Sequence, residues 1–191
     1  MSVAMSGLVL AGGASRRMGR DKAQIVLDGE PLVMRAVRTL GQVCTEVVVA
    51  SGDGHRLDHL GLPQVADVIP VAGPLGGIAA GLEAARQDLV AVVAVDMPAA
   101  SPAVFAFLAG LWQGEAAVVP VVKGRWEPLH AVWARPAGPG IVACLQAGDR
   151  KVVRVLATLG VRLVDEGEWS AAGPTGTFAA NLNVPMDLFR V

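Results

Sequence analysis

Hydrophobic residues form short continuous runs that alternate with segments of helical periodicity. Runs rich in Val and Leu predict buried strands, because a strand covered on both faces has no polar side. The predicted strands cover 7–10, 46–50, 65–69, 89–95, 116–122, 128–134 and 162–164. Between them, apolar residues at helical spacing and start signals such as Ser101-Pro102 predict helices. The predicted helices cover 31–43, 77–87, 101–113, 138–147 and 151–159.

This alternation predicts an α/β fold: a doubly wound, mostly parallel sheet with helices on both faces. The strand, loop, helix and strand over 7–50 form a βαβ unit, which implies two parallel strands. Residues 51–63 and 166–177 are polar and predict loops, and a short helix is expected after Pro185. No linker interrupts the pattern, so residues 1–191 predict a single domain. In such a sheet, ligands bind at the carboxyl ends of the strands.

Composition limits the class of protein. Hydrophobic residues make up 53% and charged residues 17% of the chain, which fits a buried sheet. No uncharged apolar run reaches the roughly 18–20 residues of a membrane span, and the first residues lack a basic leader, so we expect a cytoplasmic protein with no membrane partner. The formal net charge of −1 argues against nucleic acid as a partner. Cys44 and Cys144 form no CxxC motif and are predicted to be reduced core residues.

Positive charge is concentrated just after the first predicted strand. Gly12 and Gly13 follow that strand, and Arg16, Arg17, Arg20 and Lys22 come within the next nine residues. Glycines allow backbone N–H groups to approach phosphate oxygens, and the cations neutralise them. Neither GxxxxGK[ST] nor GxGxxG is present, so this is not a Walker loop or a dinucleotide fingerprint. A solvated turn is the alternative for the glycines alone; the combination favours a polyphosphate site.

The stretch LAGGASRRMGRDK at 10–22 resembles the signature LAGGxSxRMGxDK of nucleotidyltransferases that include the molybdenum cofactor guanylyltransferases (MobA-type). The resemblance implies a Rossmann-like nucleotidyltransferase fold, GTP as donor and molybdenum-loaded molybdopterin as acceptor. Other cofactor-biosynthesis proteins or apo-molybdoenzymes are further partners that it leaves open. The nucleotide-binding residues that it implies are Leu10, Ala11, Gly12, Gly13, Lys22, Ser51, Asp67 and Asp96.

Asp96 ends the strongest predicted strand, 89–95, and precedes Pro98. Its carboxylate suits Mg²⁺, which binds one or two carboxylates together with substrate phosphates. A turn residue is the alternative reading; the resemblance implies that the Asp of this DxP motif holds the metal. Lys22 and Arg17 are predicted to stabilise charge on the α-phosphate and on pyrophosphate. Asp21 is predicted to order the loop by pairing with a cation.

Other positions carry weaker signals. Asp67 resembles a residue near the base or ribose and reads equally well as a turn, and GPLGG at 73–77 resembles a segment that lines the same pocket. Family members often have Asn directly after the second strand, where this chain has Ala50-Ser51; Ser51 could replace one hydrogen bond. His130 lies in an apolar strand and is expected to be structural rather than a catalytic base. The four tryptophans are expected in the core or at its rim.

The acceptor side is predicted from the C-terminal part of the chain. Asn181 and Asn183 match an NxNxP motif that the resemblance links to the acceptor, and Asn183 is a further candidate metal ligand. Lys151, at the start of a predicted helix, is a candidate contact for the acceptor phosphate, with a solvated helix end as the alternative. Two rival functions remain at this point: another nucleotidyltransferase of the same fold, acting on a cytidylyl or sugar-phosphate substrate, and a non-catalytic nucleotide-binding protein.

Overall fold

The computed structural model describes residues 3–12, 21–70, 72–170 and 176–182. In this part of the chain, one eight-stranded sheet has the order β10-β7-β9-β6-β1-β4-β5, with β8 paired to β7. Its strands are β1 (Met5–Leu10), β4 (Glu46–Gly52), β5 (Gln64–Ala66), β6 (Leu89–Ala94), β7 (Ala117–Val122), β8 (Arg125–Trp126), β9 (His130–Ala134) and β10 (Val161–Val164). A small hairpin, β2 (Val26–Leu27) and β3 (Glu30–Pro31), stands apart from it.

The first strand, β1, lies inside the sheet, next to its middle strand β6. β1 pairs in parallel with β4 on one side and with β6 on the other, so the chain leaves β1 in one direction for β4 and later crosses to the opposite side. Such a reversal of strand order creates a crevice at the carboxyl ends of the strands. β9 is antiparallel to both β6 and β7, while β10 is again parallel to β7. The prediction of a mostly parallel sheet is confirmed.

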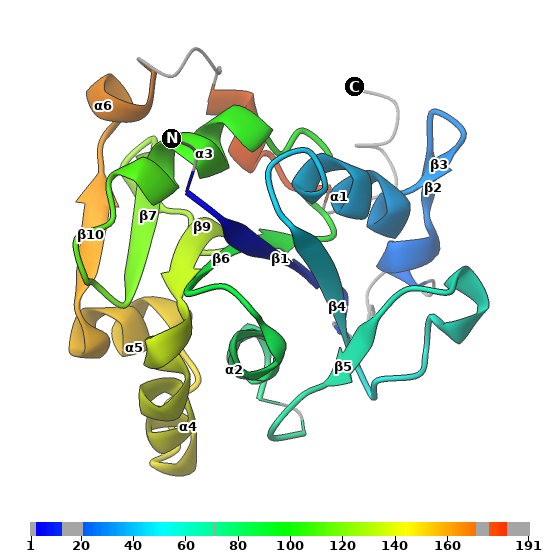
Figure 1. Ribbon diagram of the computed structural model, residues 1–191, viewed down its shortest axis with the longest axis horizontal. Helices are drawn as coiled ribbons and strands as arrows, with labels where there is room; N and C mark the ends of the chain where they lie inside the picture. The colour runs from blue at the N-terminus through cyan, green and yellow to red at the C-terminus, as the bar shows by residue number, and fades with distance from the viewer. Residues whose placement is uncertain (1–2, 13–20, 71, 171–175, 183–191) are drawn as a thin grey trace.

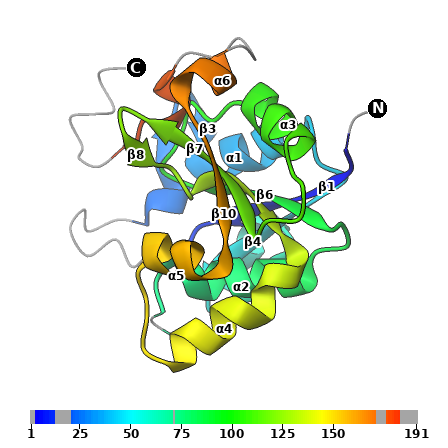
Figure 2. The same ribbon diagram turned by 90° about the vertical axis from the view of Figure 1, so that its left-hand side faces the viewer.

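Helices cover both faces of the sheet (Figures 1 and 2). α1 (Leu32–Leu40), α3 (Pro102–Gly110) and α6 (Glu166–Ser170) lie on one face, and α2 (Pro74–Ala84), α4 (Gly138–Gln146) and α5 (Val152–Leu159) lie on the other. Four short 3-10 helices complete the described elements: η1 (Lys22–Gln24), η2 (Asp58–Leu60), η3 (Arg135–Ala137) and η4 (Gly176–Ala179).

Strand alternation divides the interior into two hydrophobic clusters. Val9 and Val93 face the α1 side, and Leu8 and Val92 face the α2 side; all four side chains are fully buried. Successive side chains of a strand point to opposite faces, so a continuous apolar run supplies both clusters at once. Cys44 packs on the first cluster and Cys144 on the second, and both are free thiols, as predicted.

The segment 166–177, predicted as a loop, is partly helical, so this prediction is wrong for α6 and for the start of η4. The reason is an anchor: Trp169 is 4% exposed, and its Nε1 donates to the carbonyl oxygen of Val121 at 2.9 Å. The polar composition of segment 166–177 did not indicate that a single buried side chain, Trp169, would anchor a helix there. α2 begins at Pro74 rather than at residue 77, because Gly73 adopts φ +67° and Pro74 fits the first helical position. The helix expected after Pro185 lies outside the described residues.

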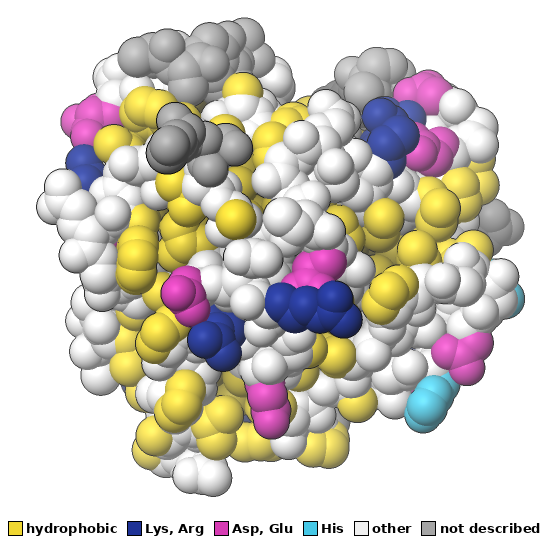
Figure 3. All heavy atoms as spheres, viewed as in Figure 1, with side chains coloured by type: hydrophobic (Ala, Val, Ile, Leu, Met, Phe, Trp, Pro, Cys, Tyr) yellow, Lys and Arg dark blue, Asp and Glu magenta, His cyan; other side chains and the backbone are white. Residues whose placement is uncertain are grey.

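Charged side chains of both signs lie side by side on the face shown in Figure 3. Ion pairs between described residues, such as Arg135 with Asp88 and Arg86 with Glu46, place charges of opposite sign next to each other. Neighbouring charges of opposite sign cancel at a distance, so this face carries no strong field of one sign. In the described part of the chain, no helix combines the length and apolar character needed to cross a membrane.

Candidate active site

A cavity of about 740 Å³ opens at the carboxyl ends of β1, β4 and β6. It forms at the strand-order reversal, where parallel sheets place ligands. Three parts of the chain that are far apart in sequence border it: the glycine turn (Ala11 and Gly12, after β1), the end of β6, and the 73–77 segment. Its lining residues are Leu10, Ala11, Gly12, Lys22, Ala50, Gly52, Asp53, Asp67, Pro70, Gly73, Pro74, Gly77, Ala94, Val95, Asp96 and Leu129.

Two glycines let the ends of β1 and β4 touch. A Cβ at Gly12 would lie 3.0 Å from the Gly52 nitrogen and 3.1 Å from its Cα, closer than side chains normally approach backbone. Gly52 has φ +92°, a conformation that favours glycine. The backbone also joins the two ends, since the Ala11 N–H donates to the Ala50 carbonyl oxygen at 2.8 Å. The cavity wall here is bare backbone, which suits close contact with phosphate.

Lys22 and Asp96 meet at the cavity, although 74 residues separate them. Lys22 begins η1, Asp96 follows β6, and the Lys22 Nζ lies 2.8 Å from the Asp96 Oδ2. Their side chains are 24% and 21% exposed, so both groups remain reachable from the cavity. A fixed cation beside a carboxylate can hold a triphosphate and the metal that accompanies it. Arg17 and Gly13, the other predicted contacts of this turn, lie outside the described residues.

The predicted acceptor residues divide into two groups. The Leu182 N–H donates to the Asp96 carbonyl oxygen at 2.8 Å, so the preceding residue, Asn181, lies beside the Asp96 loop with its side chain exposed. Asn183 lies outside the described residues. Lys151 is exposed at the N-terminus of α5 and is not among the residues that line the cavity. Asn181 therefore lies near Asp96, but neither Asn181 nor Lys151 is among the residues that line the cavity.

Asp67 lines the cavity from the far side of β4. Its backbone N–H donates to the Gly52 carbonyl oxygen at 3.0 Å, and its Oδ1 would lie 3.3 Å from a Cβ built on Gly77. Burial raises the pKa of this carboxyl above its ordinary value. A partly desolvated carboxyl is suited to hydrogen bonds with N–H or O–H groups of a bound molecule. The start of α2 completes this wall through Gly73, Pro74 and Gly77.

Ser51 is buried rather than exposed to the cavity. It is 2% exposed and is absent from the cavity lining, whereas Ala50 and Gly52 on either side line it. The pairing of β4 with β5 is irregular between Ala50 and Gly52, so this part of β4 is not a regular strand. The Ser51 hydroxyl has no hydrogen-bond partner among the described residues. The structure thus does not bring Ser51 to the cavity with the other predicted nucleotide contacts.

His130 is a core residue, as expected. It is fully buried, its ring stacks on Phe105 with centroids 4.1 Å apart, and its Nε2 accepts from the Ser101 N–H at 3.1 Å. Burial lowers the pKa of His130 to about 3, so the imidazole is neutral at any working pH. It anchors the loop that follows Asp96 rather than reaching the cavity.

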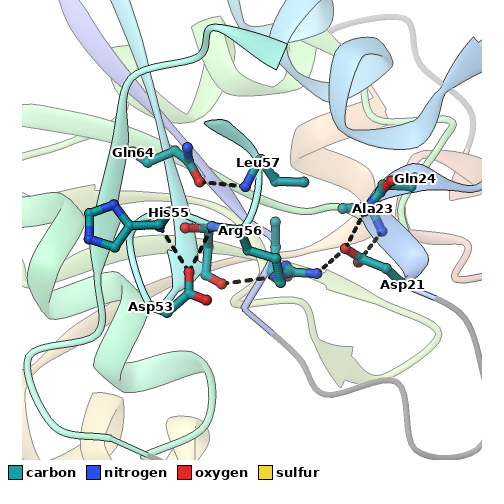
Figure 4. Close-up of polar contacts among 10 residues, drawn as sticks. Asp21, Ala23, Gln24, Asp53, His55, Arg56, Leu57 and Gln64 are labelled. Carbon is teal, nitrogen blue, oxygen red and sulfur yellow. Dashed lines mark hydrogen bonds and ion pairs between the residues drawn. The ribbon is translucent and has the colours of Figure 1, made fainter. Parts of the chain in front are cut away.

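Arg56, which sequence reasoning did not select, contacts the cavity wall without being among its lining residues. Figure 4 shows its guanidinium directed at Asp21, with Asp53 bonding the backbone of the same turn. Arg56 belongs to the glycine-rich segment 51–63, where an arginine is indistinguishable from a solvated loop residue. Only its contacts, with residues 35 to 45 positions away, mark it as part of the site.

The donor set fits a magnesium ion that shares its coordination with substrate. Mg²⁺ needs few protein ligands when phosphates and waters supply the rest, and Asp96 offers one carboxylate at the cavity. No cluster of three or more His, Cys, Asp or Glu side chains exists among the described residues, so they provide no all-protein cage.

Comparison with known proteins agrees with the resemblance seen in the sequence. Residues 7–163 match the model of the MobA-like NTP transferase domain. The chain belongs to the MobA-like NTP transferase family. The resemblance read from residues 10–22 is thereby confirmed.

Two curated relatives and one solved structure of this family align over nearly the whole chain. A Cereibacter sphaeroides protein named molybdenum cofactor guanylyltransferase is 37% identical, over 96% of this chain and 93% of its own. A Chloroflexus aggregans protein, named "Probable molybdenum cofactor guanylyltransferase", is 38% identical over 96% and 91%. The crystal structure of molybdopterin-guanine dinucleotide biosynthesis protein A from Archaeoglobus fulgidus superposes with a TM-score of 0.85 at 26% identity, covering 97% of this chain and 96% of that one.

Proposed function

We propose that this chain transfers GMP from GTP to the terminal phosphate of molybdenum-loaded molybdopterin and releases pyrophosphate, acting in the cytoplasm. The observation that carries the proposal is the meeting of Lys22 and Asp96 at a cavity walled by the glycine turn. The guanylyltransferase names of relatives 37% and 38% identical support the choice of nucleotide and acceptor. The product is then available to apo-molybdoenzymes or to other proteins of cofactor biosynthesis.

The triphosphate is held by the glycine turn and by cations. Gly12 lines the cavity without a side chain, and the Lys22 ammonium neutralises charge that develops on the α-phosphate and on pyrophosphate. Arg17, close by in sequence, adds a second cation in the proposal. The base and ribose lie toward Asp67 and the start of α2, where a desolvated carboxyl accepts hydrogen bonds.

Asp96 would hold Mg²⁺ through its carboxylate, with Asn183 as a further candidate ligand. When bound, the metal supplies positive charge that offsets the triphosphate and the leaving group. Lys22, 2.8 Å from the same carboxylate, keeps the Asp96 side chain directed at the cavity. The Leu182 N–H fixes the Asp96 backbone from the other side.

The attacking group needs no general base from the protein. A phosphate monoester has its second pKa near 6 and is largely dianionic at neutral pH. His130, the histidine nearest in sequence to the cavity residue Leu129, is fully buried and neutral, so it is not a candidate base. The protein's task is to hold two anions in line and to neutralise their repulsion. Asn181, Asn183 and Lys151 are the proposed acceptor contacts.

The proposal is tested by incubating the purified chain with Mg²⁺, molybdopterin and each nucleoside triphosphate in turn. We expect pyrophosphate release with GTP and a product whose mass corresponds to the guanylylated pterin. Turnover with CTP and not GTP would replace guanylyl by cytidylyl transfer. Binding of a nucleotide without pyrophosphate release under any combination would instead favour a non-catalytic nucleotide-binding protein.

A further inference from the structure

The Arg56 guanidinium joins three segments that are distant in sequence. Its Nη2 donates to the Ala11 carbonyl oxygen at the end of β1, and its Nε donates to the Ser51 carbonyl oxygen in β4 at 3.2 Å. Its Nη1 forms an ion pair with the Asp21 Oδ2. Arginine presents its donors in a planar, rigid fork, so three bonds in fixed directions determine where the three segments lie relative to one another.

Each of the three segments forms part of the cavity wall. Ala11 itself lines the cavity, and each of the other two contacts precedes a lining residue: Ser51 precedes Gly52, and Asp21 precedes Lys22. Arg56 itself is not among the lining residues. Its contacts therefore lie at the cavity wall or one residue behind it.

Asp21 connects Arg56 to Lys22, because it pairs with Arg56 and caps the short helix that begins at Lys22. The Asp21 Oδ1 accepts from the Ala23 N–H at 3.0 Å and so caps the short helix η1, which begins at Lys22. Burial pushes the pKa of Asp21 up, but hydrogen bonds from Gln24, Arg56 and Ala23 outweigh it and lower the pKa below its ordinary value. The charged form of Asp21 is thus the one that the turn favours (Figure 4).

We propose that Arg56 is a positioning residue, which holds the glycine turn, the end of β4 and Lys22 in one preformed nucleotide cradle without touching the nucleotide. This inference rests on the proposed nucleotidyl transfer. A preformed cradle does not have to be ordered when substrate binds, so the binding energy of the nucleotide is not spent on arranging loops. Loss of the fork therefore weakens nucleotide binding and misaligns Lys22 in the same variant.

The deciding substitution is Arg56→Lys, which keeps the charge and removes the fork. An ammonium has one nitrogen and cannot reach all three partners that the guanidinium serves. We expect the KM for the nucleotide to rise about tenfold, the loss that accompanies one strong charge-assisted hydrogen bond. A loss of folded protein would lower kcat and leave KM unchanged, so KM separates positioning from stability. Arg38→Lys is the matched control, because Arg38 on α1 pairs with Glu30 in β3, and neither residue lines the cavity.

A rise in KM of threefold or more in Arg56→Lys, with Arg38→Lys unchanged, supports the proposal, and a smaller rise overturns it. If the Arg56 variant does not fold, Asp21→Asn decides: a rise in the nucleotide KM of threefold or more supports the link to Lys22, and a smaller rise overturns it. The wild-type protein is first assayed with every nucleoside triphosphate, and the variants with whichever one it uses. Failure of the guanylyl assignment thus appears in the wild type, whereas failure of the Arg56 proposal appears only in the variants.

Discussion

At the scale of single residues, the site depends on charges placed where solvent reaches them only in part. Lys22 and Asp96 are each about one-fifth exposed, which strengthens their attraction relative to a surface pair while leaving both open to a ligand. Asp67 is held in a partly desolvated position that raises its pKa and costs some stability. Groups kept in such positions are typical of functional sites, because binding rather than folding uses them.

Asp96→Asn tests the metal and charge role of the carboxylate. The amide keeps the shape of the side chain but loses its charge, so we expect kcat to fall at least about a hundredfold with Mg²⁺ present. Stability changes little, since a partly exposed ion pair contributes about 1 kcal/mol or less. Pyrophosphate release and thermal unfolding measure the two effects. Asp88→Asn, at an exposed carboxylate paired with Arg135, is the control; near-normal turnover of Asp96→Asn would remove Asp96 from the mechanism.

His130→Phe tests the buried imidazole through pH. The folded pKa of His130 is lowered from 6.5 to about 3, so the unfolded chain takes up a proton that the folded protein does not, and stability falls as pH drops from 6.5 toward 3. Phenylalanine does not titrate but leaves the Ser101 N–H without its acceptor. We expect the variant to be less stable by about 1–3 kcal/mol at pH 7, with the difference shrinking below pH 6.

Urea unfolding at several pH values from 7 to 4 measures this difference. His59→Gln, at an exposed histidine, is the control and should follow the wild type throughout. A wild-type-to-variant difference that stays constant over this range would mean that His130 has the same pKa in the folded and unfolded states, and would contradict the lowered pKa.

At the scale of elements, the ends of strands and the turns after them create the cavity. β1, β4 and β6 run in parallel, so the residues that follow them gather at one edge. The element types were predictable from apolar runs, and so was the position of Asp96 at a strand end. The contact between Gly12 and Gly52 was not, because pairing two turns requires knowledge of which strands are neighbours.

Gly12→Ala tests the bare-backbone wall. A Cβ would lie 3.0 Å from the Gly52 nitrogen, and backbone cannot move aside as a flexible side chain can. We expect affinity for GTP to fall about tenfold or more, with a stability loss of about 1–2 kcal/mol. Gly110→Ala is the matched control, since no atom lies within 4 Å of its Cβ position. Calorimetric titration with GTP and thermal unfolding measure the two quantities; unchanged affinity in Gly12→Ala would contradict the model of the wall.

At the scale of the whole molecule, one sheet separates two hydrophobic clusters and supplies side chains to both. The clusters cannot unfold separately without exposing the other face of the same strands, for example Val92 on one side and Val93 on the other. A shared sheet therefore favours cooperative behaviour, and the prediction of a single domain over 1–191 is tested by unfolding.

We expect one cooperative transition, seen alike by far-UV circular dichroism and by tryptophan fluorescence. Trp133 belongs to the cluster on the α2 side and Trp169 to the cluster on the α1 side, so fluorescence can report each face. Trp133→Phe and Trp169→Phe variants separate the two signals. Transitions with different midpoints in urea would show that the chain contains two units that unfold independently.

The sequence by itself determined where helices and strands form and that the strands are buried, because these follow from local runs of apolar residues. It also determined the family, because one continuous motif at 10–22 carries the resemblance. It also placed Asp96 at a strand end and His130 in the core. Only the tertiary structure decided that Lys22 meets Asp96 across 74 residues, that Ser51 is buried, and that Arg56 braces three segments. The physical reason is that strand order and strand register bring distant residues together, and no local pattern of polar and apolar residues encodes which strands become neighbours.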